Sequence, residues 1–269
     1  MIKKQAVAPA TQKIDKSAFL PSNNTVIYWL GNASILIHSH ATNIMIDPLL
    51  EGFDLPLLIN MPILSNEVPA LDAILLTHCD PDHFNRLTCN NLASVTKEYH
   101  APHYVVRLLQ EESIKGIGHD IHETFSIDSI KITLTPADHA WQNREEKFRA
   151  IREYQDEDYC GFWIETIDGT IWLPGDSRLM PEHLDMPPPD VILFDFSDNE
   201  WHIGLDNAIT LANTYPGSQL ILIHWGSVDA PGMDAFNADP ELLKGRILNE
   251  DRIQLLAPGE PFDLHALLI

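Results

Sequence analysis

The chain has 269 residues, 45% of them hydrophobic, and its 39 acidic and 17 basic residues give a formal net charge of −22. This length allows a large buried core, whereas no apolar stretch approaches the roughly 20 residues that cross a bilayer. Because so negative a chain repels polyanions, we expect no nucleic-acid partner, and because no segment is long and apolar enough to cross a bilayer, we expect no membrane partner.

The sequence favours one large domain over residues 21–269, because no Gly/Ser-rich linker, repeat or low-complexity tract divides it. Residues 1–20 carry four lysines but no apolar core of signal-peptide length, so we interpret them as a loosely held N-terminal extension. Cys79, Cys89 and Cys160 have no disulfide framework spacing, which makes the cytoplasm the expected location. Homo-oligomerisation is left open.

The first predicted elements are short β-strands. Residues 25–31, 34–38 and 43–47 are β-type runs separated by turn formers, which predicts an antiparallel meander. The third run closes at Asp47, which is either a plain turn residue or a carboxylate that orients a metal-bound histidine. Residues 49–68 are rich in Leu and Pro without a sustained period, which predicts a long surface loop of the kind that often borders an active site.

The next segment, residues 73–84, changes abruptly from apolar to polar. An interior-type strand ends at Thr77, and a helix is predicted at residues 83–95. The residues between the strand and this helix, together with the first helix residue, include His78, Asp80, Asp82 and His83. Two imidazoles and two carboxylates within six residues suit Zn, Mn or Fe. An ordinary helix N-cap would explain Asp82 alone, so the segment predicts a metal site on a strand-to-helix loop.

The remaining strands also end at polar residues. After a second predicted helix at residues 104–113, strands are expected at residues 131–135, 161–166, 170–173, 191–194 and 219–223, and a helix at 206–214. The polar residues that follow these strands include His139, Asp176, Asp195, Asp198, His202 and His224. Strands that share a sense would bring these strand ends to one edge of the sheets, together with His78 to His83.

This order of motifs resembles the metallo-β-lactamase superfamily, whose pattern is a His-x-His-x-Asp-His loop, a distant His, a Gly-Asp and a final His. The resemblance is closest to the branch that includes L-ascorbate-6-phosphate lactonase and N-acyl-phosphatidylethanolamine phospholipase D. The motifs that carry it are Trp29 to Ser34, Asp47-Pro48, Thr77-His78, Pro136 to Arg144, Gly175 to Ser177, His202 and Ile223 to Gly226. The fold that it implies is an α/β (α+β) four-layer αββα sandwich.

The resemblance also implies two metal sites. The first would consist of His78, Asp80 and His139, and the second of Asp82, His83 and His224. Asp176 would bridge the two ions. Asp80 stands where the common pattern has a second histidine, so we expect two divalent ions with Zn as the first choice and Mn or Fe as alternatives.

The implied activity is hydrolysis of a small, anionic ester, lactone or phosphodiester by a metal-activated water. His202 and Asp82 are the candidate catalytic residues, His202 as proton donor to the leaving group, with capping of the following helix as the alternative. Residues 141–158 are either a solvated helix with ion pairs or a lid over the metals, and Arg144 and Trp141 are candidates for substrate binding. A metal-binding module without catalysis and a phosphodiesterase acting on a lipid or nucleotide are the alternatives.

Overall fold

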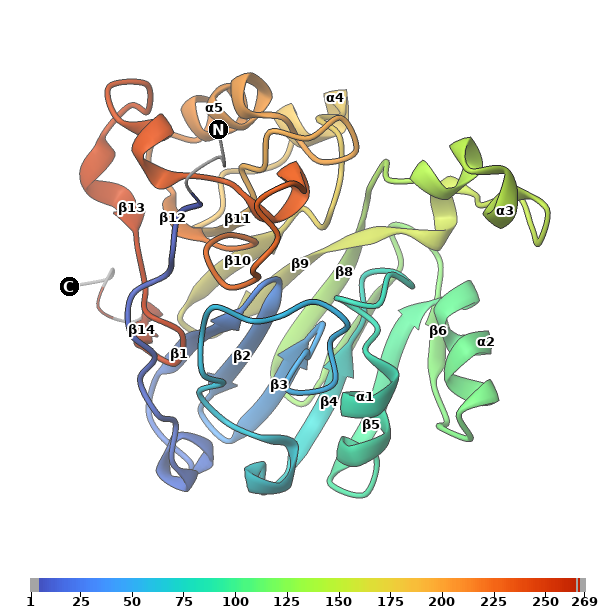
Figure 1. Ribbon diagram of the computed structural model, residues 1–269. Helices are drawn as coiled ribbons and strands as arrows, with labels where there is room; N and C mark the ends of the chain where they lie inside the picture. The colour runs from blue at the N-terminus through green and yellow to red at the C-terminus, as the bar shows by residue number, and fades with distance from the viewer. Residues whose placement is uncertain (1–4, 265, 267–269) are drawn as a thin grey trace.

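The computed structural model describes residues 5–264 and residue 266, and two β-sheets face each other in it (Figure 1). The first sheet has the order β14 (Pro261–Asp263), β1 (Thr25–Gly31), β2 (Ser34–Ser39), β3 (Thr42–Ile46), β4 (Leu71–Leu75), β5 (Thr96–Pro102) and β6 (Ile117–His119). The second has the order β13 (Ile253–Gln254), β12 (Gln219–Leu222), β11 (Val191–Phe194), β10 (Gly169–Leu173), β9 (Cys160–Thr166), β8 (Ile130–Pro136) and β7 (Thr124–Ile127).

The expected meander is confirmed, since β1, β2 and β3 pair antiparallel. From β3 to β6 the neighbouring strands are parallel, as are those from β10 to β13. The strands β7, β8, β9 and β10 pair antiparallel with their neighbours. Both sheets are therefore mixed, and each has a parallel half whose carboxyl strand ends lie at one edge.

Successive side chains of the first sheet point to opposite faces, as the period of a strand requires. Trp29 and Ile35 lie in the core between the sheets, where Phe162 of the second sheet also lies. Leu30 and Leu36, one position further along, lie in a second cluster on the outer face. The near-continuous apolar runs of these strands follow from burial on both faces.

Helices cover the outer faces. The α-helices are α1 (Arg86–Leu92), α2 (His103–Glu111), α3 (Glu146–Arg149), α4 (Pro181–Leu184) and α5 (Leu205–Thr214). Short 3-10 helices span Lys16–Phe19, Ser65–Glu67, Trp141–Arg144, Asp156–Asp158, Asp234–Phe236, Pro240–Leu243 and Glu250–Arg252. Buried residues of α1 and α2 pack on the first sheet and those of α5 on the second, which gives the expected αββα sandwich (Figure 1). Within the described residues, no helix has the length and apolarity to span a bilayer.

Three local expectations were wrong. The helix expected from residue 83 begins at Arg86, because the side chain of Asn85 caps it by accepting a hydrogen bond from the Thr88 amide at 2.8 Å. Asp82 lies before that cap and takes no part in it. Residues 141–158 form two 3-10 turns and α3 instead of one helix. There, the Asn143 side chain bonds both the amide and the carbonyl of Tyr154, which folds the segment back on itself.

The third concerns the N-terminal extension. The Ala8 amide donates to the carbonyl of Gly226 at 2.9 Å, and the Ile14 amide donates to that of Pro62 at 2.9 Å. Ala8, Ile14 and Phe19 are buried, so residues 5–20 are held against the sandwich. Their apolar positions are too widely spaced to form a periodic signal in sequence. Residues 1–4 lie outside the described residues, and we retain one domain over residues 21–269 as a proposal.

Candidate metal centre

The topology brings the expected ligands to one edge of the two sheets. Asp47 follows β3 and His78 follows the parallel neighbour β4. In the second sheet, β8, β10, β11 and β12 run in one sense, because β8 and β10 are both antiparallel to β9 and the others are parallel. His139, Asp176 and His224 follow three of these strands. The structure thus brings His78, His139, Asp176 and His224 together, and each of them belongs to a buried group of side chains that could hold a metal ion.

The first expected ligand set, called the first triad below, consists of His78, Asp80 and His139. The Asp80 Oδ2 atom lies 3.5 Å from His78 Nε2 and 3.4 Å from His139 Nε2. The potential ligand atoms of the first triad all lie within 4.8 Å of one another. Asp80 therefore lies close to both histidines of the first triad, at the position where the common pattern has a histidine.

The second expected set, called the second triad, consists of Asp82, His83 and His224. The Asp82 Oδ2 atom lies 3.5 Å from His83 Nε2 and 3.4 Å from His224 Nε2. His224 has a backbone φ of 61°, in the left-handed region that non-glycine residues seldom adopt. Such conformations cluster at functional sites because the surrounding structure has to hold them.

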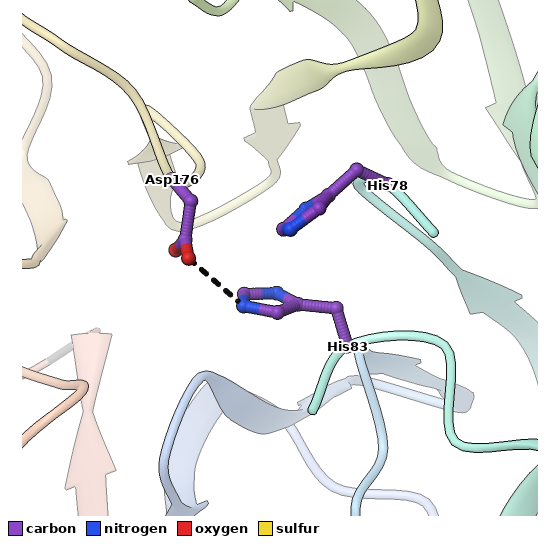
Figure 2. A group of neighbouring side chains, drawn as sticks. All are labelled: His78, His83 and Asp176. Carbon is purple, nitrogen blue, oxygen red and sulfur yellow. Dashed lines mark ion pairs between the residues drawn. The ribbon is translucent and has the colours of Figure 1, made fainter. Parts of the chain in front are cut away.

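Asp176 lies between the two triads. Its Oδ2 atom is 3.1 Å from His83 Nε2, 3.5 Å from His224 Nε2 and 3.9 Å from His139 Nε2. Figure 2 shows its carboxylate and the rings of His78 and His83 directed toward one another. The preceding Gly175 has a φ of +79°, and a Cβ there would lie 2.5 Å from the Cys160 carbonyl oxygen. Glycine is therefore required to carry the chain past β9 and to place this carboxylate.

The imidazoles fit a metal site by a test internal to the structure. The Nε2 atoms of His78, His83 and His224 are buried and have no hydrogen-bond partner. Their Nδ1 atoms are engaged, with Thr77 Oγ1 at 2.9 Å for His78 and with the Ala235 carbonyl at 2.9 Å for His224. Buried polar atoms are rarely left without a partner, and metal-ligating histidines use their other nitrogen in this way.

The electrostatics of the cluster favour positive charge. Burial alone would raise the pKa of the Asp80 carboxyl, but the imidazoles of His139 and His78 beside it more than offset this and hold the pKa below its usual value. Burial likewise acts to lower the pKa of the His224 imidazole, yet the nearby carboxylates of Asp176 and Asp82 raise this pKa well above normal. The same field stabilises a divalent ion, which would displace the protons from the imidazoles.

Several supporting residues carry no signal in the sequence. Both oxygens of Asp80 accept hydrogen bonds, Oδ2 from Trp141 Nε1 at 2.7 Å and Oδ1 from Gln142 Nε2 at 2.5 Å. The Tyr159 hydroxyl donates to Gln142 Oε1 at 2.5 Å and fixes the orientation of that amide. Asn32 lies in the Trp29 to Ser34 motif without an expected role of its own, and its side-chain amide donates to Asp82 Oδ2 at 3.1 Å.

Asp47 has the orienting position that was one of its two expected roles. Its Oδ2 atom lies 2.8 Å from His83 Nδ1. The same carboxylate accepts hydrogen bonds from the Thr77 amide at 2.8 Å and the Thr77 hydroxyl at 2.6 Å. Asp47 is buried, and three contacts leave it one orientation.

His202 is also part of the buried cluster. Its Nδ1 atom lies 2.7 Å from Asp195 Oδ2, and its Nε2 atom lies 3.5 Å from Asp176 Oδ2. The alternative of helix capping was wrong, because Gly204 is the N-cap of α5 and Asp198 Oδ1 accepts the hydrogen bond of the Leu205 amide. A cavity of about 450 Å³ opens beside His202 and also meets Asp80, Asp82, His139, Asp176 and His224.

The two expected substrate-binding residues differ in position. Trp141 lines this cavity, although its indole N–H is used by Asp80. Arg144 is not among the described residues that line it, and 59% of its side chain is exposed. Its guanidinium pairs with Glu200 at 2.9 Å, so this arginine is already matched by a carboxylate.

Comparison with known proteins agrees with this architecture. A model of the β-lactamase superfamily domain matches residues 42–225. A relative from Archaeoglobus fulgidus named a metal-dependent hydrolase is 26% identical over 254 residues, which cover 89% of this chain and 99% of the relative. A relative of the same name from Herpetosiphon aurantiacus is 29% identical over 259 residues, which cover 88% of this chain and 97% of the relative.

Two solved structures share the fold at 18% sequence identity. One is the isothiocyanate hydrolase from Delia radicum gut bacteria, with a TM-score of 0.70 over 88% of this chain and 98% of that one. The other is a metallo hydrolase from the archaeon Ignicoccus hospitalis, with a TM-score of 0.69 over 89% of this chain and 98% of that one. Because the family model covers more than half of the sequence, the chain belongs to the β-lactamase superfamily.

Proposed function

We propose that this chain is a metal-dependent hydrolase in which the two triads hold two divalent ions with Asp176 between them. The observation that carries the proposal is the set of three buried imidazole Nε2 atoms that face carboxylates without a hydrogen-bond partner. The names of the relatives from Archaeoglobus fulgidus and Herpetosiphon aurantiacus support the reaction class. Ligand sets of imidazole and carboxylate suit Zn, and they also accept Mn or Fe.

Divalent ions in such a site polarise the bond under attack and lower the pKa of a water molecule toward neutrality. The chain's own contribution is orientation. Asp47 holds the His83 ring, Asn32 holds Asp82, and Gln142 holds Asp80, so the ligands are fixed before a substrate arrives. Asp82, the second catalytic candidate, faces His83 and His224, and we propose that it serves as a ligand without a separate proton transfer.

His202 is the proposed proton donor. The Asp195 carboxylate accepts a hydrogen bond from Nδ1–H, so the second proton of the imidazolium lies on Nε2. Because His202 lines the cavity, that proton faces the space in which a leaving group would separate. General acids of this type need to reach the leaving atom directly or through one water.

The bond under attack is proposed to be an ester, lactone or phosphodiester, in keeping with the branch that the motifs resemble. The expectation of an anionic substrate rested on Arg144 and has lost that support, because Arg144 pairs with Glu200 outside the cavity lining. The alternative of a closed, non-catalytic metal module fits the geometry less well, since the ligands meet an open cavity and structural sites are closed.

The test is a metal-removal and add-back assay. Protein dialysed against a chelator should lose hydrolysis of a panel of aryl esters, lactones and phosphodiesters, and Zn, Mn or Fe(II) should restore it. The Asp176→Ala variant, assayed alongside, should stay inactive with every metal. A folded, metal-loaded protein that hydrolyses none of the three bond classes would contradict the proposed function.

A further inference from the structure

The cavity beside the metal centre has a polar floor and apolar walls. The floor is formed by Asp80, Asp82, His139, Asp176, His202 and His224. The apolar walls are formed by Phe53, Leu55, Trp141, Trp201, Met233 and Phe236. Its volume of about 450 Å³ lies within the range of about 300–1,000 Å³ that is usual for small-molecule sites. The lining therefore suits a ligand with one polar, reactive end and an apolar body.

The apolar walls are continuous with the ligands. The Phe236 ring stacks on His224 with centroids 5.4 Å apart, and Phe53 meets Phe236 edge to face at 6.1 Å. The carbonyl of Trp201 accepts a hydrogen bond from His139 Nδ1 at 2.6 Å. A molecule whose reactive group reaches Asp176 would therefore have aromatic side chains next to the rest of its body.

No lysine or arginine is among the described residues that line this cavity. The guanidiniums of Arg144 and Arg178 lie 4.4 and 5.1 Å from the Trp201 ring centroid. Both are matched by carboxylates, Arg144 by Glu200 and Arg178 by Asp138. Asp54 adds a further carboxylate to the lining. If two divalent ions are bound, the carboxylates of Asp80, Asp82 and Asp176 would offset most of their charge.

We infer that the substrate of this site has a neutral, apolar body of aromatic size, which binds between the aromatic walls with the hydrolysable group directed toward Asp176. The type of reaction in this inference rests on the proposed function. The chemistry of the substrate body rests on the cavity lining alone. A charged group on that body would lose its water without gaining a partner, which strongly disfavours binding. A lining without lysine or arginine thus discriminates against substrates that carry an anionic group on the body.

The experiment compares two fluorescent probes that differ in one charge, N-phenyl-naphthylamine and its sulfonate, anilinonaphthalene sulfonate. With metal-loaded protein, the neutral probe should bind at least about tenfold more tightly. Hydrolysis is compared in the same way, with benzyl acetate and para-carboxybenzyl acetate, and the neutral ester should have a kcat/KM at least about 100-fold higher. The para-carbamoyl ester, which has the size of the acid without its charge, separates charge from bulk.

Two charge-matched variants locate the effect. Met233→Lys places a cation on the lining at a side chain that is 47% exposed, and Leu64→Lys places one at a side chain that is 42% exposed and outside the lining. Met233→Lys should narrow the preference for the neutral probe and the neutral ester, while Leu64→Lys should leave it unchanged. The metal content of both variants is measured so that metal loss does not explain a difference.

Sulfonate binding equal to or tighter than binding of the neutral probe would overturn the inference, as would equal effects of the two lysine variants. If the neutral probe is preferred as stated but no ester, lactone or phosphodiester is hydrolysed, the proposed reaction fails while the inference on the body of the ligand stands. If esters are hydrolysed with a preference for the carboxylate, the reaction stands and the inference fails.

Discussion

The two triads use similar ligands but are held by different parts of the molecule. In the second triad, Asp47 at the end of β3 holds His83, and Asn32 in the turn between β1 and β2 holds Asp82. In the first triad, Asp80 is held by Trp141 and Gln142, which belong to the folded-back segment 141–158. One set of supports is therefore part of the β-sheet scaffold, and the other is part of a loop.

This difference predicts unequal metal affinities. Strand ends of a packed sheet are more rigid than irregular segments, and the left-handed backbone of Asp47 (φ 44°) shows that the scaffold holds this position against its intrinsic preference. We expect the second triad to bind its ion more tightly, and the first triad to respond to changes in residues 141–159.

The largest effect should come from Asp176→Ala, because the Asp176 carboxylate approaches histidines of both triads. Two cations close together repel each other, and a shared carboxylate offsets that repulsion. The variant should lose at least one metal equivalent and nearly all hydrolysis, measured by elemental analysis and steady-state assay. The exposed Asp185→Ala is the matched control and should keep both. An Asp176 variant that retains two tightly bound ions would show that the carboxylate bridges nothing.

His202→Ala should separate chemistry from metal binding. His202 belongs to neither triad, so both ions should remain, while kcat falls about 100-fold for a substrate with a poor leaving group. The loss should be smaller for a leaving group that needs no proton, such as nitrophenolate, which distinguishes proton donation from a structural role. Loss of a metal equivalent in this variant would instead make His202 a ligand.

Asp47→Asn should weaken the second triad without removing a ligand. The amide cannot serve His83 and Thr77 as the carboxylate does, and changes of this kind typically cost about 10–100-fold in metal affinity. Competition with a chelator measures the affinity of each equivalent, and circular dichroism checks the fold. An unchanged affinity for the tighter ion in a folded variant would break the proposed link between the scaffold and the second triad.

Gln142→Leu should affect the first triad only. Asp80 would lose one hydrogen bond, and the affinity for the weaker ion should fall about tenfold while the tighter ion is unaffected. Tyr159→Phe, which removes only the hydroxyl that donates to Gln142, should show the same pattern at about threefold. Equal weakening of both ions would mean that the two triads are not held independently.

The candidate ligands could be proposed from the sequence because each lies after an apolar strand, and parallel strands place their carboxyl ends at one edge of a sheet. The supporting residues could not be predicted in the same way. Gln142 and Asn32 are neutral amides whose partners are 62 and 50 residues away, and no local pattern marks them. Arg144 suggested an anion site because its partner Glu200 lies 56 residues further along the chain, and the local sequence does not indicate this pairing.

The fold shows a similar division. The strands with continuous apolar runs were predicted to within one or two residues, but β5, β6, β7, β13 and β14 were missed. β5 and β6 contain polar or turn-forming residues such as Lys97, Glu98 and Gly118, and β13 and β14 are only two and three residues long. The expectations of a cytoplasmic location and of no nucleic-acid partner rest on composition, and that of a small-molecule partner rests on the resemblance; all three stay predictions.

The most direct test of two metal sites with unequal supports is a titration of chelator-treated protein with Zn or Mn that counts the ions bound per chain. The wild-type protein should bind about two equivalents in two steps of different affinity. In Asp80→Ala the weaker step should disappear and the tighter one remain. A single step of one equivalent or less in folded wild-type protein, or loss of the tighter step in Asp80→Ala, would contradict this account.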